Sequence, residues 1–199
     1  MPRINEQQRQ VRRDQILEAA RELFTINGFH DTSMDNIIAA AGMSSGGVYG
    51  YFSGKNAIIA AIAQQVVGGI TATISGVLKI EPVPPIAEIL RRLIIQIDIL
   101  ADGPGRLALQ VWGEAQRDPV IAALAAAEGA NVRAAVLELV RRAHADGQLS
   151  QHTDLEALAQ VVFSLIPGYL LQKRIIGDVD PERYADAIDV LLRLSSAEP

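Results

Sequence analysis

The chain has 199 residues, 49% of them hydrophobic, with no cysteine and a formal net charge of −5. A chain of this length can bury one large or two small hydrophobic cores. The lack of cysteine excludes disulfides and thiolate chemistry. It also fits a reducing compartment, and the first residues contain no apolar signal segment, so we expect a cytoplasmic protein.

The negative charge lies in the later part of the chain. Residues 1–60 carry six Lys or Arg and six acids. Residues 61–199 carry twelve Lys or Arg and seventeen acids. Within the first part, residues 1–13 hold four arginines, Arg3, Arg9, Arg12 and Arg13, against a single acid. This local excess predicts a flexible arm over residues 1–8 and a first helical turn that together contact phosphates.

A helix is predicted from about residue 9 to Ile26, because its apolar residues recur on one stripe and Gly28 can end it. Two short helices then follow between Thr32 and Lys55. The spacing of Thr32 and Asp35 is typical of a capping box, Gly42 can end the first short helix, and Ser44 can cap the second. Helices this short are unstable alone and must dock on a longer neighbour, which is the arrangement of a helix-turn-helix.

The residues of this segment resemble a known family. Ala-Ala-Gly-Met-Ser, Val-Tyr and Tyr-Phe stand in order between Thr32 and Lys55, after the helix Ile16–Phe24 and the turn Asn27-Gly28-Phe29. Together they are similar to the DNA-binding domain of the tetracycline-repressor (TetR) family of bacterial regulators. The resemblance implies a homodimeric, all-helical repressor that leaves a pseudo-palindromic double-stranded DNA operator when a small-molecule effector binds.

The rest of the chain also follows a helical period. Helices are predicted at about 54–79, 86–101, 107–116, 118–145, from 154 onward and from 181 onward, and no strand pattern occurs. Pro82, Pro84 and Pro85 separate the helix at 54–79 from the helix at 86–101. Pro167 should kink its helix or open a gap in it. We therefore expect an all-α fold, with a helix-turn-helix domain at residues 9–55 and an effector-binding and dimerisation domain at 56–199.

One segment invites a membrane interpretation. Asn56 to Leu78 carries no charge over 23 residues, a length that can span a bilayer. Gln64, Gln65 and the Gly68-Gly69 pair are costly or unhelpful in hydrocarbon. We therefore interpret the segment as the helix that connects the two domains.

DNA contacts are predicted at the leading ends of the two short helices and next to them, where side chains can reach the major groove. The predicted residues are Arg12, Thr32, Ser33, Met34, Ser44, Ser45, Gly46, Gly47, Tyr49, Tyr51 and Lys55. Where relatives usually carry longer side chains, this second helix has Ser45, Gly47 and Gly50. Two alternatives stay open: the segment is a helical hairpin in a core, or, as the small residues suggest, the protein is a small-molecule sensor or carrier that has lost specific DNA binding.

Lys55 is a candidate phosphate anchor. It lies in the first turn of its helix, where free backbone amides also attract an anion. The alternative is a solvated surface lysine.

The signal for an effector site is weaker. Aromatic area with a few polar groups is typical of cavities that bind small molecules, and a mainly apolar effector is expected. The candidate residues are Gln110, Trp112, Gln116, Phe163, Tyr169 and Gln172. Each of them is also compatible with an ordinary core or surface position.

A dimer interface is predicted on the last two long helices, because they carry more apolar surface than one thin domain can cover and a two-fold DNA reader needs a two-fold interface. The predicted residues are Leu155, Leu158, Val162, Ile166, Tyr184, Ile188 and Leu191.

Catalysis and metal binding are not expected. His144, Asp146, His152 and Asp154 are near in sequence, but their spacing across a loop matches no regular metal site. The chain contains no Gly-x-Ser-x-Gly elbow and no phosphate-binding loop. We therefore predict a regulator with no cofactor and no metal.

Overall fold

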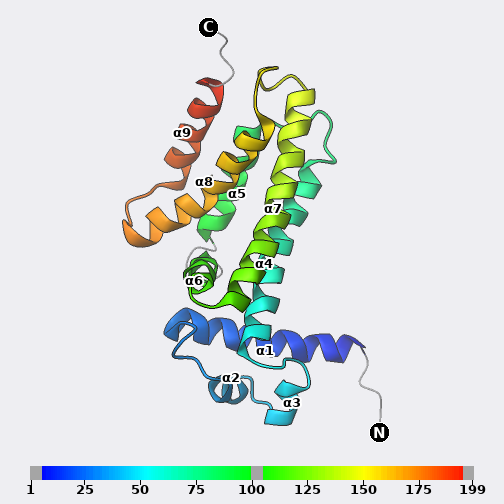
Figure 1. Cartoon of the computed structure of the whole chain (residues 1–199), viewed down its shortest axis with the longest axis vertical. Helices are drawn as coiled ribbons and strands as arrows, with labels where there is room; N and C mark the ends of the chain where they lie inside the picture. The colour runs from blue at the N-terminus through cyan, green and yellow to red at the C-terminus, as the bar shows by residue number, and fades with distance from the viewer. Residues whose placement is uncertain (1–5, 100–104, 195–199) are drawn as a thin grey trace. The chain divides into compact units, whose positions relative to one another are not determined.

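The computed structural model describes residues 6–99 and 105–194. These described residues form helices and no strand, which confirms the all-α prediction (Figure 1). In chain order the helices are α1 (Glu6–Asn27), α2 (Met34–Ala40), α3 (Ser45–Tyr49), α4 (Lys55–Val77), α5 (Ile86–Ile99), α6 (Arg106–Ala115), α7 (Pro119–Ala145), α8 (Leu155–Ile175) and α9 (Pro181–Leu194). The chain divides into two compact units, Met1–Gln65 with Arg106–Ala125 and Val66–Gly105 with Ala126–Pro199.

The first helix is longer than the sequence pattern predicts. α1 is already helical at Glu6, the first described residue, so residues 6–8 do not belong to an arm. Arg3 lies outside the described residues. At the other end, Gly28 has a φ of 79°, which confirms its predicted role in ending the helix.

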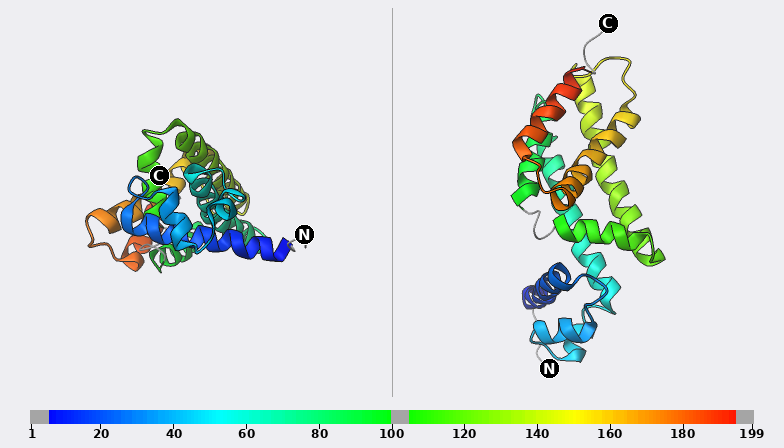
Figure 2. Two further views of the ribbon diagram at one scale, coloured as in Figure 1. Left: turned by 90° about the horizontal axis from the view of Figure 1, so that it is seen from below. Right: turned by 90° about the vertical axis from the view of Figure 1, so that its left-hand side faces the viewer.

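The first unit has a continuous hydrophobic core. α1 contributes Ile16, Leu17 and Phe24, each fully buried, and these pack with residues of α2, α3 and the start of α4. Leu107 and Val111 of α6 join the same cluster. The two short helices therefore bury their apolar faces on longer neighbours, which is what their length requires, and both lie beside α1 in Figure 2.

The second unit packs α5 against α9, which lie side by side in both figures. Arg91 of α5 bonds Glu182 at 2.6 Å and also pairs with Asp186, so the two helices share charge contacts as well as apolar ones. α7 and α8 add Leu139, Val140 and other residues to this core. α8 continues as a helix through Pro167, and the kink or gap expected there stays a prediction.

A charged group is partly enclosed between α5 and α8. Tyr169 is fully buried and its hydroxyl donates to the carboxylate of Asp98, while Lys173 Nζ lies 3.0 Å from the same carboxylate. Burial opposes ionisation of Asp98, but the hydrogen bonds from Tyr169 and Lys173 outweigh it, so the pKa of Asp98 is lowered. Burial and the bond to Asp98 raise the pKa of Tyr169 well above its usual range.

An Asp98→Asn substitution is therefore expected to lower the free energy of unfolding at pH 7 by about 2 kcal/mol, because Lys173 and Tyr169 lose a charged partner. A lowered folded-state pKa stabilises the protein above the pKa of the unfolded group, about 3.9, and this contribution disappears as the pH falls through the folded value. Urea unfolding should thus show a gap between wild type and variant that closes in acid. Asp178→Asn, at an exposed position, is the control. A gap that does not depend on pH would contradict this account of Asp98.

Among the described helices, α4, α7 and α8 are by length and composition apolar enough to cross a bilayer. Part of the apolar surface of α4 is used within the chain. Ile58, Ile59 and Ile62 lie in the core of the first unit and Ile74 in the core of the second.

Candidate nucleic-acid interface

The turn between α2 and α3 has the backbone geometry that the sequence predicts. Gly42 has a φ of 63°, a conformation that favours glycine, and the Gln15 amide of α1 donates to the carbonyl of Ala41 at 2.7 Å. Ser44 Oγ accepts from the Gly47 amide at 3.2 Å, which confirms its role as the cap of α3. α1 thus holds the end of α2 while the cap fixes the start of α3.

The cap of α2 is not the predicted one. Ser33 Oγ accepts from the Asn36 amide at 3.1 Å, and Asn36 Oδ1 accepts from the Ser33 amide at 2.9 Å. The side-chain oxygen of Asn36 supplies what an acid supplies in the predicted box, so the box begins one residue later. Thr32 is fully buried, and its hydroxyl donates to the carbonyl of Gly28 at 2.8 Å. Its predicted contact with DNA is therefore wrong.

α3 presents a small, polar surface to solvent. Val48 is fully buried and anchors the helix in the core, whereas Ser44, Ser45 and Gly46 are exposed and Tyr49 is 49% exposed. A side-chain carbon added at Gly46 would meet nothing within 4 Å. The helix is thus not a buried hairpin arm. Ser33 is also exposed, and Met34 packs partly against the core.

Lys55 has a different role from either interpretation of its sequence position. Its ammonium donates to the carbonyl of Phe29 at 2.6 Å and to the carbonyl of Thr32 at 3.1 Å. It is half-buried and ties the loop between α1 and α2 to the start of α4. Two of its three N–H donors are directed to the protein backbone, so the contacts in the structure give it a structural role, and the phosphate anchor stays a prediction.

Replacing Lys55 by methionine should lower the free energy of unfolding by about 2 kcal/mol, because two carbonyls lose a charged donor. The aliphatic packing is kept, so the loss reports the ammonium. Lys79→Met, at an exposed position, serves as the matched control in urea unfolding. Equal stability of the two variants would show that the contacts of Lys55 contribute nothing.

Polar contacts also join α6 and the residues after it to the helix-turn-helix segment and the start of α4 inside the first unit. Glu114 lies 2.9 Å from His30, and Asn56 donates to Asp118 at 3.3 Å. Gln110 donates to the carbonyl of Phe24 at 3.2 Å, while its own amide oxygen is buried without a hydrogen-bond partner in the structure. The residues of each pair are 62 to 86 positions apart in the sequence, so no local sequence pattern predicts these contacts.

The predicted effector residues are divided between the two units. Gln110, Trp112 and Gln116 belong to the first unit, and Trp112 is 42% exposed. The other three belong to the second unit, where Tyr169 is a buried core residue and Gln172 is exposed. Phe163, also half-buried, lies near Gly129 of α7.

The predicted dimer face is largely core. Val162 and Ile188 are 2% and 3% exposed, and Leu155, Leu158, Ile166 and Tyr184 pack partly buried against the same cluster. Only Leu191, at 61%, is well exposed. The prediction is wrong for the buried residues because the bulkier apolar stripe of each helix is used inside the unit.

A second stripe of α8 is left uncovered in the described chain. Its members recur at alternate intervals of four and three residues and are exposed or half-exposed: Ala157, Val161, Ser164, Gly168, Leu171 and Ile175. An open groove of about 490 Å³ runs along it, lined by residues that include Gln160, Leu165 and Tyr184 of α9. Val190 of α9 is also exposed.

These features define a class of protein. A helix-turn-helix packs against α1 and exposes its second helix, and a helical domain follows it. Family models match both parts. Residues 16–62 match bacterial regulatory proteins of the tetR family, and residues 101–194 match the carboxy-terminal domain of BetI-type transcriptional repressors. The chain belongs to the TetR family and is a DNA-binding transcriptional regulator.

Individual relatives agree with this assignment. The chain is 29% identical to the HTH-type transcriptional regulator UidR of Escherichia coli over 81% of each chain. It is 25% identical to the HTH-type transcriptional repressor Rv1474c of Mycobacterium tuberculosis over 96% of each. Its fold resembles Salmonella enterica GusR, with a TM-score of 0.80, 23% identity and coverage of 94% and 95%. A complex of SmeT with triclosan gives a TM-score of 0.78, at 22% identity and coverage of 94% and 93%.

Proposed function

We propose that two copies of this chain occupy a pseudo-palindromic operator and block transcription until a small, mainly apolar effector binds. The observation that carries this proposal is the surface of α3, where Ser44, Ser45, Gly46 and Tyr49 face solvent while Val48 holds the helix in the core. Residues 9–55 read the DNA in the cytoplasm, and residues 56–199 bind the effector and form the dimer. The function requires no catalytic step.

The small side chains of α3 define how it reads bases. A major-groove helix with Arg or Asn can form two hydrogen bonds to one base edge, and α3 has neither residue. Ser44, Ser45 and Tyr49 offer single hydroxyl contacts, and Gly46 lets the backbone approach the groove floor. Specificity then depends on close fit and on the local shape of the DNA as well as on base contacts.

The dimer forms through the uncovered stripe of α8 together with the exposed residues of α9. Its spacing of four and three residues is that of helices packed at a shallow angle in a bundle. Ala157 and Ser164 allow two helices to approach closely, and Val161 and Leu171 supply apolar area. A second copy is the natural occupant, because a symmetric operator needs a symmetric protein.

The effector-binding role is supported by the fold shared with SmeT, which has been solved with the apolar phenol triclosan. Triclosan is therefore a suitable first probe. A ligand present at 100 times its Kd should raise the free energy of unfolding by about 2.7 kcal/mol. Effector binding must then favour a conformation in which the two recognition helices no longer fit successive major grooves, about 34 Å apart.

Selection from a pool of random duplexes tests the DNA-binding proposal. Repeated capture on the purified protein should enrich a two-fold-symmetric motif, and binding to that motif should weaken as salt increases. A helical sensor or carrier that has lost specific DNA binding would enrich no motif. That outcome would favour the alternative function and reject the repressor.

A further inference from the structure

Residues 6–65, the described part of the first unit before α6, contain five Lys and Arg side chains: Arg9, Arg12, Arg13, Arg21 and Lys55. Arg21 forms a 3.0 Å ion pair with Glu18 and also donates to Gln65. Lys55 donates to two backbone carbonyls. Arginines of the first three turns of α1 are therefore the cations that remain available to phosphates.

Two of these arginines rest on aromatic rings that directly follow α3. The guanidinium carbon of Arg9 lies 5.9 Å from the centre of the Tyr51 ring, and that of Arg13 lies 5.4 Å from the centre of the Phe52 ring. Arg9 and Arg13 are one helical turn apart, and Tyr51 and Phe52 are adjacent. The two guanidinium groups are thus held side by side next to the carboxy-terminal end of the recognition helix.

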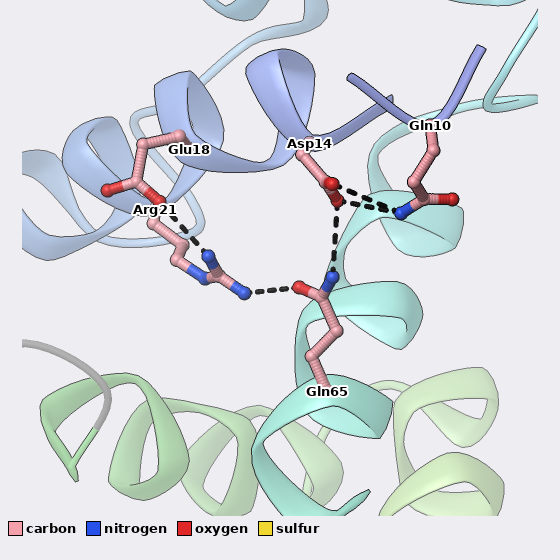
Figure 3. A network of polar contacts seen from close by, with 5 residues as sticks. All are labelled: Gln10, Asp14, Glu18, Arg21 and Gln65. Carbon is pink, nitrogen blue, oxygen red and sulfur yellow. Dashed lines mark hydrogen bonds and ion pairs between the residues drawn. The ribbon is translucent and has the colours of Figure 1, made fainter. Parts of the chain in front are cut away.

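This arrangement holds the cations without neutralising them. An aromatic face attracts a guanidinium through its quadrupole, and the edge donors of the guanidinium stay free for an anion. The acid next to Arg13 is already engaged: Asp14 accepts from Gln10 at 3.0 and 3.1 Å and from Gln65 at 3.5 Å (Figure 3). No ion pair of the described residues includes Arg9 or Arg13.

We infer that Arg9 and Arg13, positioned by Tyr51 and Phe52, form a paired clamp for the phosphates of the DNA backbone beside the groove that α3 enters. The inference rests on the proposed function and adds to it the source of the affinity that α3 lacks. A stacked guanidinium has lost part of its conformational freedom before DNA arrives. It therefore loses less entropy on binding than an arginine that moves freely in solvent.

The first test measures how affinity for a random-sequence 24-base-pair duplex depends on salt. The plot of log affinity against log salt has a negative slope. Arg9→Ala/Arg13→Ala should make this slope less negative by about 1.8, or about 0.9 for each phosphate contact. Arg117→Ala, which removes one exposed charge elsewhere in the first unit, should leave the slope unchanged. Circular dichroism checks that each variant is folded.

The second test asks whether the Tyr51 ring positions Arg9, using a double-mutant cycle. Replacing Tyr51 by leucine keeps the apolar volume and removes the ring. The loss of DNA affinity caused by Arg9→Ala should then be about two- to fivefold smaller than in the wild type. Tyr51→Phe keeps the ring and should keep the full cost of Arg9→Ala. This comparison separates the ring from any contact that the tyrosine hydroxyl makes with DNA.

The inference is rejected if Arg9→Ala/Arg13→Ala leaves the slope unchanged while the wild type binds. It is also rejected if the cycle with Tyr51→Leu is additive. If the wild type itself shows no salt-dependent binding to any duplex, the proposed function fails instead, so the two failures can be told apart.

Discussion

Replacing Val161 and Leu171 by glutamate is expected to leave a monomer that binds the operator at least about 100-fold more weakly. Both residues lie on the uncovered stripe of α8, at 59% and 49% exposure. A two-fold interface contains each substitution twice, so four carboxylates would lose water in the dimer, and like charges at an interface cost several kcal/mol. A monomer can then contact only one half-site.

Sedimentation equilibrium at micromolar concentration measures the oligomeric state, and anisotropy measures operator affinity. Ile80→Glu is the matched control, since Ile80 is an exposed apolar residue in the connection between α4 and α5. The control should remain dimeric. A dimer that persists in Val161→Glu/Leu171→Glu would place the interface on another surface.

A Gly46→Asp substitution should strongly weaken operator binding and leave the fold intact. Gly46 is exposed, and a side-chain carbon there meets nothing within 4 Å, so the fold has room for it. An acid in the first turn of α3 is favourable for the helix, and a residue other than glycine raises helix propensity. On DNA the same carboxylate faces phosphates, and this repulsion should weaken binding by about 100-fold.

Gly46→Asn provides the control, because asparagine has nearly the same size and no charge. It should retain much more affinity than Gly46→Asp, whereas urea unfolding should find both variants as stable as the wild type or more so. If the two variants lost affinity equally, size and not charge would govern this position. If neither lost affinity, α3 would not contact DNA.

Local chemistry explains most of what the sequence predicts correctly. Gly28 and Gly42 end their helices with positive φ angles, and Ser44 caps the helix that follows it. Each of these signals is complete within four residues, so it can be recognised without the rest of the fold. The wrong prediction of a cap at Thr32 also follows from a local signal. The sequence offers Thr32 with Asp35, whereas the structure uses Ser33 with Asn36, one residue later.

The failed predictions depend on contacts between distant residues. α8 carries two apolar stripes, and the sequence alone does not say which one the unit buries. The stripe with Val162 and Tyr169 packs inside, and the stripe with Val161 and Leu171 is left outside. Lys55 reaches carbonyls 23 and 26 residues earlier in the chain. The spacing of four and three residues along the outer stripe of α8 is the sequence signal that favours the proposed interface.

The most direct test of the account is the affinity of the wild-type protein for its selected motif when the spacing of the half-sites is changed. Adding five base pairs between them turns one half-site by about half a helical turn, so two rigidly paired recognition helices can no longer enter both major grooves. We predict that two protomers bind the original duplex, and that the insertion lowers the affinity to that of a single half-site. Equal affinity for both duplexes would contradict a two-fold reader of DNA.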